Sequence, residues 1–394
     1  MNFEFKFRKR EMDSTVNVSL IHHVNFLVSN ANQAAFWYSC CMGFERFAEC
    51  RKKTTLSIAL RNGKAILLIT SPTSPVVVEL NAEIAKHGDF VKDIAFQVDN
   101  MDLIIQTLKC KDLKILDEPK VIRDTDGAIR LCRIQGSAGS IVHTLIEQMP
   151  EEAYNGVFLP GFVRIPPIEF CSLQSVIPVL SIDHVVENHE EGTLDTITDW
   201  YNEVFRMHRF WSVDEKVVHT EYSALKAYLV ANKKENVQIT LAEPVPTTKR
   251  KTGQLQEFLD FHTSPGIQHI AFTVDNIVEV VAAMKKRSVE FLSFPSTYYA
   301  NLRERLQTTN LQIHEELDEI ESHGILMDFD EGGYLLQIFT KPMQSRPTFF
   351  IEIIQRHNFK GFGAGNFKAL FEAVELEQKK RGTLDVPLEN GKSY

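Results

Sequence analysis

Residues 332–367 read GGYLLQIFTKPMQSRPTFFIEIIQRHNFKGFGAGNF, two apolar segments followed by a glycine-rich turn and the start of a helix. We expect strands over residues 334–339 and 348–355, and the second is apolar through its middle except for Glu352. A carboxylate is costly to bury unless a cation compensates it, but strand residues alternate between two faces. Glu352 therefore either points to solvent from an edge strand or faces a cation, and this stretch alone leaves both interpretations open.

Composition and charge limit the class of protein. A chain of 394 residues predicts roughly two to four domains or repeated modules. The net charge of −9 argues against a general nucleic-acid-binding protein, and no apolar run is long enough to span a bilayer, so we expect neither nucleic acid nor membrane as a partner. All six Cys lie at or before Cys171 without a CxxC pattern, which is typical of reduced thiols in a cytoplasmic protein.

Three pairs of short segments recur in the same order in the two halves of the chain. The pairs are LIHHVNFL (20–27) with SIDHVVEN (181–188), VKDIAFQVDN (91–100) with IQHIAFTVDN (267–276), and HTLIEQM (143–149) with TFFIEII (348–354). The middle pair ends in Asp-Asn, which can cap a following helix, and apolar residues then recur at helical spacing in both halves. The pattern favours an internal duplication, with two strand–helix–strand units in each half.

The spacing of these repeats predicts the domain boundaries. Residues 1–16 are charged, lack a secretory apolar segment and are expected to be a disordered extension. Five prolines over residues 150–179 indicate a linker. We therefore expect an N-terminal structural domain over residues 17–150, a linker over 151–178, a C-terminal metal-binding domain over 179–377 and a polar tail over 378–394. Residues 298–321 are expected to be an inserted, largely helical excursion.

The repeats also align candidate metal ligands. The second half carries His184, His269 and Glu352 at its three repeated strand positions. Two His and one carboxylate can hold Fe(II) and leave three coordination positions open, two for a bidentate 2-oxo acid and one for dioxygen. The first half carries His23, Asp93 and Glu147 at the matching positions, and we expect it to be structural.

The second half closely resembles the 4-hydroxyphenylpyruvate dioxygenase family of the vicinal oxygen chelate superfamily. The matching runs are HRFWSVDEKVVHTEYSAL, GIQHIAFTVDNI, VEFLSFPSTYYANLRERL, GYLLQIFTKP and RPTFFIEIIQRHNFKGFGAGNFKALFEA. The first half matches more loosely, through FLVSNANQAAFWYSCCMGFE and AKHGDFVKDIAFQVDN. The resemblance implies an α+β fold of two tandem halves, each of paired βαβββ modules forming an open, barrel-like sheet, with iron held by His184, His269 and Glu352.

The resemblance also implies an activity and a substrate pocket. The family converts 4-hydroxyphenylpyruvate and dioxygen to homogentisate and carbon dioxide in tyrosine breakdown. The resemblance also implies that the protein is a homodimer. A helix from residue 366 to about residue 381 resembles the family's lid over the pocket. The residues that match the family's aromatic and polar pocket positions are Phe339, Phe350, Phe362, Phe367, Gln254, Gln268, Gln337 and Asn366.

The chain departs from the family at the pocket. Ala227 stands where the family usually has Ser, and residues 240–244 read TLAEP where the family has Pro-Ile-Asn-Glu-Pro, so Thr240 and Ala242 replace a Pro and an Asn. These departures leave the product open. Homogentisate is the leading expectation, the alternatives being an enzyme that forms 4-hydroxymandelate from the same substrate and a non-catalytic metal-binding homologue.

Overall fold

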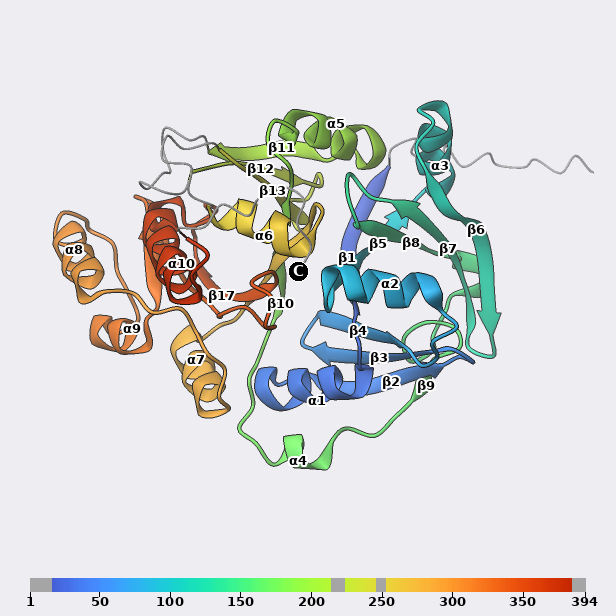
Figure 1. Ribbon diagram of the computed structural model, residues 1–394, viewed down its shortest axis with the longest axis horizontal. Coiled ribbons are helices and arrows are strands. Elements are labelled where there is room, and N and C mark those ends of the chain that lie inside the picture. The colour runs from blue at the N-terminus through green and yellow to red at the C-terminus, as the bar shows by residue number, and fades with distance from the viewer. Residues whose placement is uncertain (1–15, 214–223, 246–252, 385–394) are drawn as a thin grey trace, which may run out of the picture.

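The computed structural model describes residues 16–213, 224–245 and 253–384. The expected disorder of the N-terminal extension and the polar tail beyond residue 384 lie outside these residues. Figure 1 shows two sheets beside each other, one from the first half of the chain and one from the second. None of the described helices is long and apolar enough to cross a membrane.

The first half forms a curled sheet. Its strands are β1 (Asn17–Leu27), β2 (Glu45–Arg51), β3 (Thr55–Asn62), β4 (Ala65–Pro72), β5 (Phe90–Asp99), β6 (Ile115–Asp124), β7 (Gly127–Gln135), β8 (Val142–Gln148) and β9 (Val163–Arg164). Within the described residues they lie in the order β6-β7-β8-β5-β1-β4-β3-β2-β9. The antiparallel pair β1–β5 stands at the centre, and each of these strands has a parallel neighbour, β4 or β8.

The second half repeats this topology. Its strands are β10 (Ser181–Asn188), β11 (His208–Val213), β12 (Leu225–Ala231), β13 (Gln238–Pro244), β14 (Gly266–Thr273), β15 (Leu326–Phe329), β16 (Tyr334–Phe339) and β17 (Phe350–His357). They lie in the order β11-β12-β13-β10-β14-β17-β16-β15, which matches the first sheet strand for strand apart from β9. Each half is therefore a pair of βαβββ modules, and the predicted fold class is confirmed.

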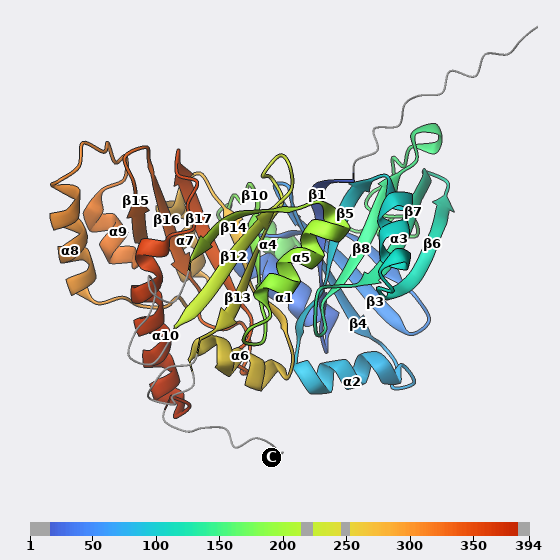
Figure 2. The same ribbon diagram turned by 90° about the horizontal axis from the view of Figure 1, so that it is seen from above.

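Helices lie between the strands and after the last one. They are α1 (Ala31–Met42), α2 (Val78–His87), α3 (Met101–Cys110), α4 (Glu169–Ser172), α5 (Leu194–Phe205), α6 (Gln254–His262), α7 (Ile277–Lys286), α8 (Ser296–Leu306), α9 (Leu317–His323) and α10 (Phe367–Arg381), with 3-10 turns η1 (Pro150–Glu152) and η2 (Ala364–Asn366). The Asp-Asn caps form as predicted, because Asn100 accepts a hydrogen bond from the N–H of Leu103 and Asn276 from that of Glu279. Helices α8 and α9 form the predicted excursion, at the edge far from the first half (Figure 1, Figure 2).

One strand begins later than the sequence suggested. Strand β17 starts at Phe350, two residues after the expected start. The N–H of Thr348 donates to the carbonyl of Arg346 and that of Met343 to Phe349, each at 2.8 Å. These bonds close a turn around Pro347, so the chain reaches the sheet ladder only at Phe350, opposite His269.

A single apolar core joins the two halves. It includes buried residues of both sheets and of the crossover helices α1, α3, α5 and α7. Aromatic rings meet edge to face across the boundary, Phe26 with Phe349 at 5.2 Å and Phe44 with Phe272 at 5.5 Å between centroids. The shared core fixes the second sheet against the first, since both contribute to the same packed interior.

The concave interiors of the two sheets are filled differently. In the first, Phe158 and Leu159 of the expected linker pack against apolar residues of the strands, such as Phe47. Strand β9 of the same segment pairs with β2. In the second, helix α10 covers the interior and leaves a cavity beneath it. The segment 151–178 thus connects the halves and also closes the first one.

The same irregularity interrupts the central strand pair in both sheets. The register shifts just before His23 in β1 and just before His184 in β10, leaving His22 and Asp183 as extra residues. A bulge of this kind re-aims a side chain. A ring nitrogen of His22 lies 2.9 Å from Nδ1 of His23, and a carboxylate oxygen of Asp183 lies 2.8 Å from Nδ1 of His184.

The third repeat of the sequence is misaligned by three residues. The sequence matched Glu147 to Glu352, but the strand pairing gives another register. Asp93 pairs with Val142 and His269 with Phe350, so the first-half residue at the position of Glu352 is Thr144. The backbone N–H of Thr144 donates to the carboxylate of Asp93 at 2.8 Å.

Glu147 has a structural role instead, which Gln355 fills in the second half. Glu147 accepts a hydrogen bond from the N–H of Met101 at 2.7 Å, and Gln355 accepts one from that of Ile277 at 2.7 Å. Each side chain therefore satisfies a free N–H at the first turn of the crossover helix beside it.

The packing of Phe158 inside the first sheet predicts a large loss of stability when this ring is removed. Its ring is 7% exposed and contacts His22, His23 and Phe47. Replacing it with Ala should lower the free energy of unfolding by about 3–5 kcal/mol, because a large buried ring is lost and a cavity remains. Urea denaturation of the two proteins measures this difference.

The matched control is Phe170→Ala in the same segment, because that ring is 57% exposed. We expect it to change the free energy of unfolding by about 0.5 kcal/mol or less. Equal effects of the two substitutions would show that Phe158 does not close the first interior.

Candidate metal centre and substrate cavity

Three side chains converge at the centre of the second sheet. They come from neighbouring strands, His184 from β10, His269 from β14 and Glu352 from β17. The pairing explains the convergence, since His184 and Glu352 both lie opposite Ala271, two residues beyond His269 and hence on the same face of the sheet. The cost of burying Glu352, which the sequence left unexplained, is thus met by two imidazoles.

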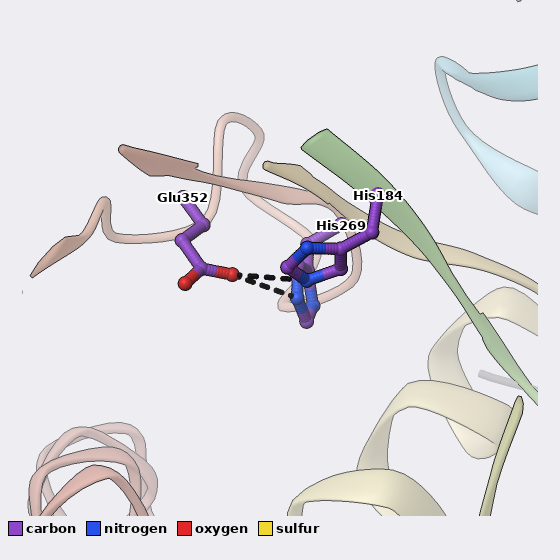
Figure 3. Close-up of side chains that lie close together, drawn as sticks. All are labelled: His184, His269 and Glu352. Carbon is purple, nitrogen blue, oxygen red and sulfur yellow. Dashed lines mark ion pairs between the residues drawn. The ribbon is translucent and has the colours of Figure 1, made fainter. Parts of the chain in front are cut away.

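The geometry is compact. Oε2 of Glu352 lies 3.3 Å from Nε2 of His184 and 3.4 Å from Nε2 of His269 (Figure 3). The three ligand atoms lie within 4.8 Å of one another, and across the part of the chain that the structure describes this is the one such group of His, Cys, Asp or Glu. All three residues are buried. The first half has no counterpart there, because Thr144 replaces the carboxylate.

The protonation of the three groups is coupled. Burial opposes the ionisation of Glu352, but hydrogen bonds and charges of the two imidazoles outweigh it and hold the pKa of Glu352 below its usual range. Burial also disfavours protonated His184, but hydrogen bonds to Asp183 and Glu352 raise its pKa to about 9. For His269 burial dominates and lowers the pKa. A divalent cation bound between the three would release the proton of His184, so its binding would weaken at lower pH.

Neighbouring residues orient the two imidazoles. Asp183 lies 2.8 Å from Nδ1 of His184, and the side-chain oxygen of Gln268 lies 3.3 Å from Nδ1 of His269. Hydrogen bonds at Nδ1 leave Nε2 of each ring free to act as a ligand. Sequence analysis missed Asp183, because alternation along a strand predicts that it faces away from His184 and the bulge is not visible in the sequence.

A cavity opens over the three residues. It encloses about 610 Å³ of empty space, counting the part that is open to solvent. Its lining residues are His184, Val186, Trp211, Leu225, Ala227, Thr240, Ala242, Gln254, Leu255, Gln268, His269, Phe339, Phe350, Glu352, Phe362, Phe367, Leu370 and Phe371. The wall is mostly apolar with a few polar groups, as in small-molecule sites.

The four predicted aromatic residues all line this cavity. The ring of Phe350 stacks on that of His269 with centroids 4.6 Å apart, and Phe339 lies edge-on to the same imidazole at 6.2 Å. Phe362 lies 5.2 Å from His184, nearly perpendicular. The aromatic wall therefore begins in direct contact with the candidate ligands.

The four predicted polar residues divide into two groups. Gln254 and Gln268 line the cavity. Gln337 and Asn366 do not; Gln337 is 1% exposed, and neither of its amide atoms has a hydrogen-bond partner among the described residues. The side-chain oxygen of Asn366 accepts a hydrogen bond from the hydroxyl of Tyr298 at 2.7 Å, which turns it away from the cavity.

The glycine-rich turn fits closely over Gln337. Gly363 has φ +71°, and a Cβ added there would lie 2.3 Å from the amide oxygen of Gln337. A larger residue would therefore be both strained and overlapped with the amide. This close approach explains why the turn between β17 and α10 needs a glycine at this point.

The departures from the family lie in the cavity wall. Ala227 and Ala242 face each other across strands β12 and β13, and Thr240 lies two residues earlier on β13. All three line the cavity. The smaller side chains thus change the wall that any bound ligand would contact.

Several cavity residues were not singled out from the sequence. Trp211 is the largest, and its ring lies 5.8 Å from Phe362 and 6.5 Å from Phe367. It stands in one of the runs that resemble the family, but no repeat marks it. Leu370 and Phe371 come from helix α10, whose helical spacing signalled an apolar face without showing what that face covers.

Helix α10 contacts the rest of the second half at both ends. Phe367 and Phe371 of its first turns line the cavity. At its other end Arg381 forms an ion pair of 2.8 Å with Glu257 of α6, and the hydroxyl of Thr383 donates to the same carboxylate at 2.5 Å. Glu257 is buried, whereas the side chain of Arg381 is 28% exposed, so solvent screens this pair only in part.

Comparisons with known proteins agree with this arrangement. Residues 181–338 match the model of the Glyoxalase/Bleomycin resistance protein/Dioxygenase superfamily. A Caenorhabditis elegans protein whose name states no activity is 50% identical, over 93% of this chain and 99% of that protein. The 4-hydroxyphenylpyruvate dioxygenase of Caenorhabditis elegans is 43% identical, over 92% of each chain.

Among solved structures, a triple mutant of 4-hydroxymandelate synthase from Streptomyces coelicolor superposes with a TM-score of 0.77. It is 29% identical, and the match covers 92% of this chain and 99% of that one. The similarity to the dioxygenases extends over nearly the whole of both sequences. The chain belongs to the 4-hydroxyphenylpyruvate dioxygenase family.

Proposed function

We propose that this protein is an Fe(II)-dependent dioxygenase that converts 4-hydroxyphenylpyruvate and dioxygen to homogentisate and carbon dioxide. The observation that carries the proposal is the buried group of His184, His269 and Glu352 at the floor of an aromatic cavity. The likeness to dioxygenases of that name over almost the full chain supports the substrate.

The donor set fits iron. Two imidazole nitrogens and one carboxylate oxygen are the protein ligands typical of non-haem Fe(II) oxygenases, and three ligands leave positions open. When bound, iron would supply the positions for the 2-oxo acid and dioxygen and the electrons that activate dioxygen. His184, His269 and Glu352 would hold it, with Asp183 and Gln268 fixing the two rings.

The aromatic wall would hold the phenol ring of the substrate. Phe339 and Phe350 lie beside His269, while Phe362 and Phe367 close the opposite side with Trp211. A planar ring held between such faces loses its freedom to rotate, which brings the ring close to the metal ligands in one orientation. The same apolar side chains exclude water from the reaction.

The amides would provide the polar contacts. Gln254 and Gln268 reach the cavity, and their donors and acceptors can meet a hydroxyl or carboxylate of the substrate. Within the described residues the buried amide of Gln337 has no hydrogen-bond partner, which is costly unless a ligand group or water supplies one. Asn366 is better described as positioning the start of α10 through Tyr298.

Helix α10 would act as the lid of the cavity. Phe367, Leu370 and Phe371 close it from above, and the ion pair of Arg381 with the buried Glu257 holds the far end of the helix. Substrate entry then requires the first turns of α10 to move while the far end stays attached. The proposed C-terminal domain, residues 179–377, includes the first turns of this lid, and the helix continues to Arg381.

Two alternatives concern the product and the activity. A 4-hydroxymandelate-forming enzyme is favoured by the likeness to the Streptomyces coelicolor synthase, but the identity there is 29% against 43% for the dioxygenase of Caenorhabditis elegans. A non-catalytic homologue is disfavoured by the intact metal group. We retain the homodimer implied by the family, and the six free cysteines support the cytoplasm as its location.

The metal assignment predicts the behaviour of Glu352→Ala. It should abolish turnover and weaken Fe(II) binding by more than the roughly 10–100-fold that changes outside the ligand set cost, because two imidazoles alone form a poor site. Anaerobic Fe(II) titration and dioxygen uptake measure the two effects. The matched control is Asp93→Asn in the first half, which should leave both nearly unchanged. Full iron content in a His184→Ala/His269→Ala variant would contradict the assignment.

The lid predicts the effect of shortening the chain. A protein ending at Gly365 should remain folded by circular dichroism but consume dioxygen or lose iron without forming matching product, because water reaches the reaction. A chain ending at Leu384, which keeps α10 and Thr383, serves as the control and should couple normally. Normal product yield per dioxygen in the shorter protein would refute the lid.

The cavity wall predicts the product. Wild type should form mainly homogentisate, since Phe367 and the other aromatic residues are retained. Ala227→Ser/Ala242→Asn should lower KM by about tenfold, equivalent to about 1.4 kcal/mol and within the range of a restored hydrogen bond. Chromatography of the products of both proteins tests this. If 4-hydroxymandelate dominates in wild type, the leading function is wrong.

A further inference from the structure

Arg356 on β17 forms an ion pair with Asp183, the residue that orients His184. Its Nε donates to Oδ2 of Asp183 and its Nη2 to Oδ1, each at 2.9 Å. Such a two-pronged pair fixes both partners in one plane and is stronger than a single contact. Two further contacts fix the carboxylate of Asp183: Nδ1 of His184 lies 2.8 Å from Oδ1, and the hydroxyl of Thr273 donates to Oδ2 at 3.2 Å.

The same guanidinium holds the turn that leads to the lid helix. Its Nη1 donates to the carbonyl of Phe359 at 3.1 Å and to that of Gly361 at 2.5 Å. Its central carbon lies 5.0 Å from the centre of the Phe362 ring, and this ring lines the cavity and contacts His184. One planar group therefore touches the orienting carboxylate on one edge and the turn on the other.

We propose that Arg356 is a positioning residue that couples the orientation of His184 to the arrangement of residues 359–362, the turn before lid helix α10. The inference rests on the proposed metal site. Its physical basis is the rigidity of the guanidinium fork, whose donors point in fixed directions. If the turn moves away with the lid, Arg356 loses the two carbonyls that hold it against Asp183, and the hydrogen bond that fixes His184 loosens.

The coupling must act in both directions. An interaction through which the turn stabilises the ligand geometry also lets metal binding stabilise the turn, because coupling free energies are reciprocal. Metal binding should therefore slow amide hydrogen exchange in the turn, which lies outside the ligand set. A merely structural ion pair would stabilise the fold without transmitting this effect.

The experiment uses the full chain, stripped of metal and titrated with Fe(II) without oxygen. Fe(II) affinity and amide exchange of residues 357–371 are measured for wild type, Arg356→Met, Arg356→Lys and Arg303→Met. Arg303 is the matched control, because on α8 it also pairs with two carboxylates, at 2.7 Å from Asp318 and 2.6 Å from Glu321, and it does not line the cavity.

We expect Fe(II) to slow exchange in the turn of wild type and Arg303→Met. Arg356→Met should bind Fe(II) about 10–100-fold more weakly, the range for residues that orient ligands, and should show no slowing even at saturating Fe(II). Arg356→Lys keeps a charge near Asp183 but cannot reach the carbonyls in the same geometry. It should recover part of the affinity without recovering the protection of the turn.

Different failures identify different errors. Equal Fe(II) affinity and equal protection in wild type and Arg356→Met would overturn the coupling and leave the proposed function intact. Wild type that binds no Fe(II) would overturn the proposed function and the coupling with it. If circular dichroism shows that Arg356→Met does not fold, the test rests on the wild-type protein. Amide exchange in residues 359–362 of wild type that does not change on Fe(II) binding would overturn the coupling.

Discussion

The structure of the second half depends on the pairing of one buried carboxylate with two imidazoles. Glu352 lies in the middle of an apolar strand at the centre of the sheet, where an unpaired charge would be strongly destabilising. Its stability there requires His269 on the adjoining strand β14 and His184 on β10, the next strand along, and these strands must keep the register that brings the three side chains to one face. The order and register of the central strands are therefore fixed by the same requirement that brings the three side chains of the site together.

Duplication explains how such a site arises in a sheet that also has a purely structural version. Both halves share the strand order and the bulge before the first repeated His. In the first half, the position of Glu352 is Thr144, which bonds to Asp93, and Phe158 and Leu159 fill the interior. In the second half, Glu352 stands in place of the hydroxyl and helix α10 in place of the plug, and a cavity lies beneath the helix. The same scaffold is thus filled by side chains in one half and covered by a helix in the other.

The sequence predicts much of the fold and of the candidate site, and the features that it does not predict have physical reasons. Periodicity and caps gave the strands and crossover helices, and β16 matches its expected range of residues 334–339. The repeats pointed to the three candidate metal ligands, and the structure brings these side chains together. Two of the three repeats align correctly, and these carry His184 and His269. The third was misaligned by three residues because an apolar strand offers little to fix its register. Asp183 and Arg356 could not be foreseen, since their roles depend on a bulge and on a contact across strands. The hydrogen bond of Asn366 with Tyr298, in place of a position in the cavity wall, likewise depends on packing with α8.

We propose above all that iron binds between His184, His269 and Glu352, beneath helix α10. Anomalous X-ray diffraction at the iron edge, from crystals of the protein loaded with Fe(II) without oxygen, tests this most directly. We expect a single strong peak within bonding distance of Nε2 of both imidazoles and of a carboxylate oxygen of Glu352. An iron peak elsewhere in the chain, or a well-ordered site without iron in crystals shown to contain it, would contradict the claim.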